Sequence, residues 1–210
     1  MSKIQEIALA VENGKSKIIE GLVQEALAEG IEPQKILNEG MINAMTVVGE
    51  KFQRDEVFVP EMLIAARTMK RGVEVLKLKL ATGETTMLGK CIIGTVHGDL
   101  HDIGKNLVAL MLESAGFEVI DLGVDVPSEN FLNTLKANPD AKIVALSALL
   151  TTTMPAMKDT AAALKNSELK GFKLIVGGAP ITEQFAQEVG ADGYSADAAG
   201  AVVLAKKLTA

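Results

Sequence analysis

The sequence predicts a helical bundle followed by an α/β domain built on a doubly wound parallel sheet. Up to about residue 80, apolar residues recur at the three-or-four spacing of amphipathic helices. From residue 90 onward, short apolar runs alternate with glycine-containing turns and helical patterns, as in parallel strands joined by helical crossovers. The stretch between them has no periodicity, so we expect domains at 1–80 and 90–210 joined by a linker at 81–89.

Four helices are expected in the first domain. Gly30 is placed to end the helix that begins near Ile18. Pro33 and Pro60 stand in the first turns of the two long helices that follow. The expected helices cover residues 2–11, 18–27, 33–52 and 60–76. The short connections between them favour a compact four-helix bundle.

Five strands and five helices are expected in the second domain. The strands are expected at residues 90–96, 117–122, 142–147, 172–176 and 192–194. The helices are expected at residues 104–115, 128–137, 154–166, 181–189 and 197–208. Ligands of open parallel sheets bind at the carboxyl ends of the strands, near the point where the strand order reverses. Functional residues are therefore expected in the loops 97–104, 122–127, 147–153 and 177–180.

Composition and charge argue against a nucleic-acid or membrane partner. The 210-residue chain is 48% hydrophobic and 23% charged, with a formal net charge of −6, so no basic face is expected to neutralise phosphates. No apolar run reaches the roughly 18–20 residues that cross a bilayer. The first residues lack the apolar core of a signal peptide, so we expect a cytoplasmic protein. Cys91, the single cysteine, stands in an apolar run and is expected to be a buried strand thiol.

The loop after the first expected strand carries both histidines of the chain. It reads Thr-Val-His-Gly-Asp-Leu-His-Asp-Ile-Gly-Lys-Asn from Thr95 to Asn106. Histidine is the commonest metal ligand, and a ligating imidazole usually donates its other ring N–H to a carboxylate. Asp99, two residues before His101, is placed to accept that bond. Gly104 lets a bulky ligand lie close to the backbone of the next helix.

Other kinds of site fit this loop less well. A zinc or iron hydrolase would use its four nitrogen and oxygen donors, His97, Asp99, His101 and Asp102. Four ligands within six loop residues converge poorly on one tetrahedral ion, and no further histidine is available. A dinucleotide site is disfavoured because no G-x-G-x-x-G follows the first strand. A phospho-acceptor receiver domain would have an aspartate after the third strand, where this chain has Ser147.

Three separated motifs resemble those of base-off, histidine-on cobalamin-binding proteins. The run Asp99-Leu-His-Asp-Ile-Gly104 resembles their D-x-H-x-x-G signature, Ser147-Ala-Leu149 their S-x-L motif, and the pair 177–178 their double glycine. Residues 1–80 resemble the helical cap of methionine synthase and of the corrinoid proteins of methanol and methylamine methyltransferase systems. The resemblance covers nearly the whole chain. It implies a helical cap followed by a Rossmann-like, flavodoxin-like cobalamin-binding domain.

The resemblance also implies roles for individual residues of the sheet domain. His101 would be the axial cobalt ligand in place of the cofactor's own lower base, and Asp99 and Thr153 would form a hydrogen-bonded relay behind it. The displaced nucleotide tail would lie in a slot beside the double glycine and two hydroxyl groups. The cofactor-binding residues expected on this basis are His101, Asp102, Gly104, Ser147, Leu149, Thr151, Gly177 and Gly178.

The cap is expected to shield the reactive face of the corrin ring. By resemblance to the cap module, Phe52, Val59 and Met62 would cover a cobalt-bound methyl group, because an apolar cover excludes water and oxidants. The alternative for each of them is an ordinary place in the bundle core. If the cap shields the methyl group it must move aside for transfer, and the 81–89 linker is the expected hinge.

The resemblance implies a corrinoid methyl carrier rather than an enzyme acting alone. A substrate-specific methyltransferase would load the methyl group onto Co(I) from a methylamine, methanol, a quaternary amine or an aryl methyl ether. A second methyltransferase would remove it from methyl-Co(III) to a thiol or tetrahydrofolate, and a reductive activator would restore cobalt oxidised to Co(II). The alternatives are the cobalamin-binding subunit of a carbon-skeleton mutase, which normally lacks the cap, and a cobalamin-sensing regulator, which would need a DNA-binding module.

Overall fold

The computed structural model describes residues 1–80 and 88–210 of the chain. It divides into two compact units, Met1–Thr86 and Met87–Ala210. Most of the expected linker, residues 81–89, lies outside the described residues, and its last residue, Gly89, already begins the first strand. The hinge therefore stays a prediction.

The first unit is helical. Its elements are α1 (Lys3–Glu12), α2 (Ile19–Ala28), α3 (Pro33–Lys35), the π-helix η1 (Ile36–Ile42), α4 (Asn43–Gln53) and α5 (Val59–Leu80). A capping box fixes the start of α1: the Ser2 hydroxyl accepts the Gln5 N–H at 3.3 Å, and the Gln5 side chain accepts the Ser2 N–H at 3.0 Å. Two of the N–H groups that every helix leaves unpaired at its start are thereby satisfied.

The expected helix over residues 33–52 is not a single α-helix, because the π-helix η1 widens its middle. The buried residues of η1 are Ile36, Leu37, Gly40 and Met41, a spacing that also fits an α-helix. The apolar pattern could therefore not show the wider turn. Gly40 lets η1 lie close to α1, since a Cβ there would be 3.1 Å from the Cγ2 atom of Ile7.

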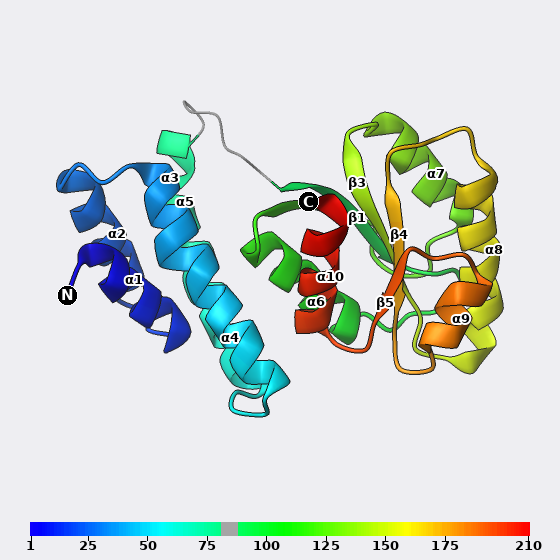
Figure 1. Ribbon diagram of the computed structural model, residues 1–210, viewed down its shortest axis with the longest axis horizontal. Coiled ribbons are helices and arrows are strands. Elements are labelled where there is room, and N and C mark those ends of the chain that lie inside the picture. The colour runs from blue at the N-terminus through cyan, green and yellow to red at the C-terminus, as the bar shows by residue number, and fades with distance from the viewer. Residues whose placement is uncertain (81–87) are drawn as a thin grey trace. The chain divides into compact units, whose positions relative to one another are not determined.

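The second unit is a five-stranded parallel sheet covered by helices on both faces. Its strands are β1 (Gly89–Thr95), β2 (Phe117–Asp121), β3 (Ala141–Ser147), β4 (Lys173–Gly177) and β5 (Gly193–Ser195), in the order β2-β1-β3-β4-β5. Its helices are α6 (Ile103–Ser114), α7 (Ser128–Ala137), the short 3-10 helix η2 (Thr151–Thr153), α8 (Met154–Asn166), α9 (Glu183–Glu188) and α10 (Ala198–Thr209). The doubly wound parallel sheet is confirmed. Figure 1 shows α6 and α10 on one face of the sheet and α7, α8 and α9 on the other.

The strand register brings one residue from each of four strands to the carboxyl edge. Thr95 of β1 pairs with Ser147 of β3, Ser147 with Gly177 of β4, and Gly177 with Ser195 of β5. Below this edge the core is apolar. Phe131 of α7 is fully buried and packs where Gly94 has no side chain, since a Cβ on Gly94 would be 2.7 Å from the Phe131 ring. Removing that ring would cost about 3–5 kcal/mol of stability.

Cys91 is buried in β1, as expected of a strand thiol. Burial raises the pKa of its thiol to about 12, because a thiolate is poorly solvated there. Within residues 1–80 and 88–210, no helix combines the length and the apolar character needed to cross a membrane.

Candidate functional site

The candidate site lies at the carboxyl ends of β1 and β3, where the strand order reverses. β1 pairs with β2 on one side and with β3 on the other. The chain leaves β1 toward α6 and leaves β3 toward α8, on opposite faces of the sheet (Figure 1). Ligands of such sheets bind in the crevice between the two diverging loops. The first loop carries Asp99 and His101, and the second carries residues 148–153.

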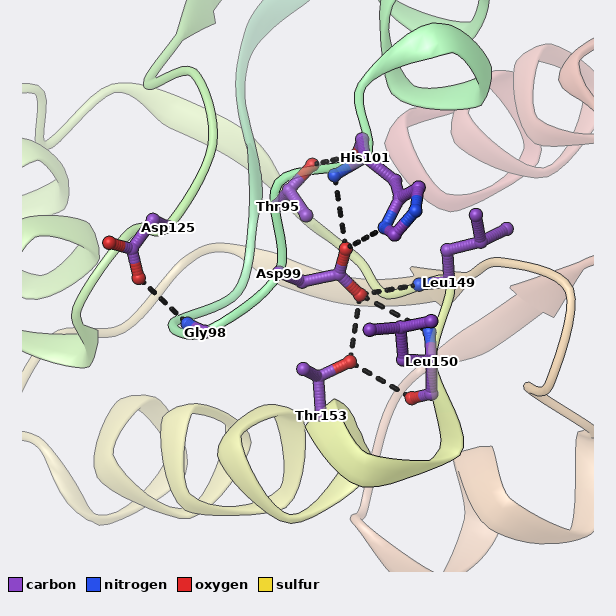
Figure 2. Close-up of polar contacts among 8 residues, drawn as sticks. All are labelled: Thr95, Gly98, Asp99, His101, Asp125, Leu149, Leu150 and Thr153. Carbon is purple, nitrogen blue, oxygen red and sulfur yellow. Dashed lines mark hydrogen bonds and ion pairs between the residues drawn. The ribbon is translucent and has the colours of Figure 1, made fainter.

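The buried Asp99 side chain joins the two loops. Its Oδ1 atom accepts the His101 backbone N–H at 3.1 Å and lies 2.7 Å from His101 Nδ1. Its Oδ2 atom accepts the N–H of Leu149 at 2.7 Å, the N–H of Leu150 at 3.3 Å and the Thr153 hydroxyl at 2.7 Å. Figure 2 shows these bonds converging on one carboxylate. A buried charge is tolerated only when it is well hydrogen-bonded, so Asp99 favours this arrangement of both loops.

The pKa of the Asp99 carboxyl is held well below its usual range. Burial by itself would raise this pKa, but the hydrogen bonds from Leu149, Thr153 and His101 stabilise the carboxylate and outweigh burial. Asp99 is therefore ionised at neutral pH and can only accept hydrogen bonds. The Nδ1 atom of His101 must then be the donor, which leaves the lone pair of a neutral imidazole on Nε2.

His101 is held at its backbone while its ring stays partly open. The Thr95 hydroxyl donates to the His101 carbonyl oxygen at 2.9 Å, which ties the loop back to the end of β1. The His101 side chain is 48% exposed. In the described part of the chain no hydrogen bond reaches Nε2, so this nitrogen is free to bind a metal from outside.

Exposed apolar side chains surround the histidine. Leu100 is 71% and Ile103 85% exposed, and Leu149 and Leu150 on the opposite loop are 43% and 40% exposed. A Cβ built on Gly104 would meet no atom within 4 Å. An exposed apolar patch around a free ligand nitrogen is the surface that a large, flat, mostly apolar metal macrocycle would cover. The residues present therefore fit a corrinoid.

The double glycine lies beside the site, on the carboxyl end of β4. Gly178 has φ +128°, and a Cβ there would overlap the carbonyl group of Ala148, which follows β3. A Cβ on Gly177 would be 3.1 Å from the Ser195 carbonyl oxygen. The packing of neighbouring strand ends thus already requires a glycine at 178. A contact of either glycine with a nucleotide tail stays a prediction.

The remaining expected residues of the sheet domain take separate positions. Ser147, the last residue of β3, is partly buried, and Thr151 is exposed on the first position of η2. Asp102 stands just before α6, and its carboxylate accepts the Asn106 side-chain N–H at 3.0 Å rather than joining the Asp99 network. Their contacts with a cofactor stay predictions.

The three expected cap residues differ in exposure. Phe52 of α4 is partly buried, Val59 at the start of α5 is 40% exposed, and Met62 one turn later is fully buried. Burial of Met62 fits a place in the bundle core, whereas Val59 and its neighbour Phe58, 62% exposed, present apolar surface to solvent. Their role as a cover stays a prediction.

Other contacts of the site were not expected from the sequence. The Thr95 hydroxyl and the Leu150 N–H both support the His101 loop. His97 forms a second pair, with its Nδ1 2.7 Å from Asp125 Oδ1. The sequence does not show these contacts, because each hydrogen bond joins residues that only the fold brings together. Among the described residues, no three or more His, Cys, Asp or Glu side chains are grouped as metal donors.

Comparisons with known proteins agree with this geometry. A B12 binding domain model matches residues 89–203, and a second model described in the same words matches residues 3–77. Dimethylamine corrinoid protein 1 of Methanosarcina acetivorans is 42% identical over 99% of this chain and 97% of its own length. A corrinoid protein of Desulfitobacterium hafniense is 37% identical over 99% of this chain and 98% of its own length.

Solved structures show the same two-part fold. A cobalamin-binding protein from Desulfitobacterium hafniense matches with a TM-score of 0.81 at 33% identity, over 98% of each chain. The methanol:cobalamin methyltransferase complex of Methanosarcina barkeri matches with a TM-score of 0.87 at 29% identity, over 99% of this chain and 79% of that chain. The predicted fold, family and corrinoid cofactor are confirmed. The chain belongs to the B12-binding corrinoid proteins, the family that includes the dimethylamine corrinoid proteins.

Proposed function

We propose that this chain is a methyl carrier that holds a corrinoid through Nε2 of His101 and passes a methyl group between two methyltransferases. The observation that carries the proposal is a partly exposed imidazole whose Nδ1 is bonded to the buried Asp99 while no described residue occupies Nε2. When bound, the corrinoid would supply a cobalt ion that accepts a methyl group and gives it up. The protein residues would hold, orient and shield it.

His101 and Asp99 together can hold the proton that competes with the metal. The pKa of Asp99 lies well below its usual range, so Asp99 would be ionised whether or not His101 held a metal. A proton and a metal ion would then compete for the one free ring nitrogen, His101 Nε2. Binding of the metal and binding of the proton thus exclude each other at one atom, so each pKa unit in the pair changes ligand strength by about 1.4 kcal/mol.

Thr153 sets how strongly Asp99 attracts that proton. Its hydroxyl lies 2.7 Å from Asp99 Oδ2, on the side opposite the histidine. A donor at this position withdraws charge from the carboxylate and stabilises its ionised form. Thr153 can therefore tune His101 without touching the cofactor.

The proposal includes partners. Methyltransferases are expected because the relatives are corrinoid proteins, one of them named for dimethylamine, and a solved neighbour is a methanol:cobalamin methyltransferase complex. A substrate-specific methyltransferase would load the methyl group, and a second one would deliver it to a thiol or tetrahydrofolate. A reductive activator would rescue oxidised cobalt. The chain itself would carry the cofactor without transforming a substrate alone.

The helical unit supports a carrier over the small subunit of a carbon-skeleton mutase. Residues 3–77 match a B12 binding domain model in their own right, and a stand-alone mutase subunit normally lacks such a cap. An apolar helical cover suits a group that must be kept from water between two transfer steps.

Reconstitution with hydroxocobalamin tests the proposal. The native chain should retain the corrinoid through gel filtration, and its visible spectrum should change in His101→Ala. His97→Ala is the matched control, because His97 is also partly exposed and also bonded to a carboxylate at 2.7 Å. The proposal fails if the native chain retains no corrinoid, or if His101→Ala and His97→Ala give the same spectrum as the native chain.

A further inference from the structure

The end of β2 and the loop that follows it, residues 121–126, contact the His101 loop, residues 96–102, near both of its ends. Two carboxylates make these contacts. Asp125 reaches the beginning of the His101 loop at residues 97–99, and Asp121 reaches the first turn of α6, where that loop ends. β2 is the edge strand of the sheet, so this support comes from the side opposite the Leu149–Thr153 loop.

The Asp125 carboxylate holds the backbone of the His101 loop. One oxygen, Oδ1, accepts the Gly98 N–H at 2.7 Å and lies 2.7 Å from His97 Nδ1, and Figure 2 shows the bond to Gly98. The Gly98 N–H is the largest cause that keeps the pKa of Asp125 below its usual range, and His97 adds to it. Asp125 is therefore a charged acceptor for the N–H of Gly98, the residue before Asp99.

The backbone of Asp125 also bonds the His101 loop. Its N–H donates to the carbonyl oxygen of Asp99 at 2.9 Å, and the next residue, Val126, forms a parallel bridge with Val96. Asp125 has φ +52°, a left-handed conformation that aspartate and asparagine tolerate better than most residues. The side chain of Asp125 thus fixes the peptide before Gly98, and its main chain fixes the peptide after Asp99.

The far end of the loop is held by a buried cation. Lys105 in the first turn of α6 has a side chain only 2% exposed, and its Nζ lies 2.6 Å from Asp121 Oδ1. Asp121 Oδ1 also accepts the Gly123 N–H at 2.9 Å. The ion pair therefore ties the start of α6 to the end of β2.

We propose that Asp125 is a positioning residue for His101: by bonding the Gly98 N–H and the Asp99 carbonyl oxygen, Asp125 sets the position of Asp99, which in turn orients His101. The Lys105–Asp121 ion pair has the same role at the other end of the loop. The inference rests on the proposed role of His101 as the metal ligand. It adds a third strand end to a site otherwise made by β1 and β3. Loss of the Asp125 hydrogen bonds would leave the cofactor bound, but the His101 ring would be less well oriented toward the cobalt.

Two variants separate the carboxylate from the backbone conformation. Asp125→Gly removes the side-chain oxygen while glycine accepts φ +52° without strain. Asp125→Asn keeps an oxygen acceptor for Gly98 and a residue tolerant of that conformation. Asp192→Asn is the matched control: Asp192 accepts a backbone N–H from Leu174 at 2.8 Å and pairs with Lys165 at 3.1 Å, but lies at the amino ends of the strands.

The full chain without cofactor gives the first readout, the hydrogen exchange rate of the Gly98 amide. Loss of a hydrogen bond to a charged acceptor should raise this rate about tenfold or more in Asp125→Gly. Asp125→Asn should show a smaller rise, and Asp192→Asn none.

The chain loaded with hydroxocobalamin and reduced to Co(II) gives the second readout. When the chain carries 15N-labelled histidine, the nitrogen hyperfine splitting in the electron paramagnetic resonance spectrum separates cobalt bound by histidine from cobalt bound by the cofactor's own 14N base, and so reports the fraction bound by histidine. That fraction should fall in Asp125→Gly, be largely kept in Asp125→Asn and stay native in Asp192→Asn, while visible absorption shows that all variants retain the corrinoid.

Equal behaviour of Asp125→Gly and Asp192→Asn in both readouts would overturn the inference. Should Asp125→Gly fail to fold, Asp125→Asn decides, because a faster exchange of the Gly98 amide than in Asp192→Asn is still expected of it, and equal rates would overturn the inference. If the native chain shows no imidazole on cobalt, the proposed function fails, and the Gly98 exchange rates still decide whether Asp125 holds the loop.

Discussion

Thr153 Oγ1 lies 2.7 Å from Asp99 Oδ2 and 2.9 Å from the Leu150 carbonyl oxygen, so one hydroxyl proton faces two acceptors. Asp99 is ionised, because its pKa lies well below the usual range. A hydrogen bond to a charged acceptor is stronger than one to a neutral carbonyl, so the Thr153 hydroxyl donates to Asp99 rather than to the Leu150 carbonyl. Thr153 is also the residue before α8, and through it the helix start is coupled to the histidine.

Thr153→Val should weaken the site while Thr153→Ser preserves it. Valine keeps the volume but leaves Asp99 Oδ2 with fewer donors, at a cost of about 1–3 kcal/mol in the free energy of unfolding. The pKa of Asp99 should rise in the same variant. Urea denaturation and carboxyl carbon NMR measure the two effects. Equal losses in the valine and serine variants would show that the hydroxyl does not matter.

Asp99 should make stability depend on pH in the acid range. Its pKa is depressed in the folded chain, so its contribution is fully present above the unfolded value of about 3.9 and is lost as the pH falls toward the folded value. Asp99→Asn should be less stable than the native chain at pH 7 by about 1–3 kcal/mol, because its amide N–H₂ must face donor groups. The difference in the free energy of unfolding between the two proteins should become smaller below about pH 4. Urea titrations at several pH values measure this difference, and a difference that does not change with pH would contradict a depressed pKa of Asp99.

Most element boundaries could be predicted because local signals set them. The expected helices 128–137 and 154–166 match α7 and α8 end to end, and the expected strand 142–147 differs from β3 by one residue. The helix expected from 181 begins at Glu183 instead, because the Thr182 hydroxyl accepts the Phe185 N–H at 3.2 Å and caps it.

The contacts of Asp99 with His101 and Thr153 could be predicted, but those made from the end of β2 could not. Three motifs and a resemblance singled out His101, Asp99 and Thr153, although 54 positions separate Asp99 from Thr153. The Asp125 contacts were beyond sequence reasoning, because they require knowing that β2 pairs with β1 and in which register. The same limit applies to η1, since one widened helical turn leaves the apolar spacing almost unchanged.

Gly178→Ala should destabilise the sheet unit strongly. Its φ of +128° is a conformation that only glycine adopts readily, and a Cβ would overlap the Ala148 carbonyl group. We expect a loss of about 3 kcal/mol or more in the free energy of unfolding. Gly123→Ala is the control, because Gly123 also has a positive φ, +82°, but a Cβ there meets nothing within 4 Å. Similar losses in the two variants would mean that backbone strain alone, and not the contact with Ala148, makes glycine necessary.

Gly104→Leu should separate cofactor binding from folding. Gly104 lies in the first turn of α6, three residues after His101, and a Cβ there meets no protein atom within 4 Å. Leucine is also a better helix former than glycine by up to about 1 kcal/mol, so the free energy of unfolding of the cofactor-free chain should stay the same or rise. If the open space above Gly104 is where the macrocycle lies, a leucine side chain must collide with it, and hydroxocobalamin should be retained much less than by the native chain. Gly21→Leu is the control, because Gly21 also lies in a helix, α2, and a Cβ there also meets nothing within 4 Å. Full retention by Gly104→Leu would show that the corrin ring does not approach the start of α6.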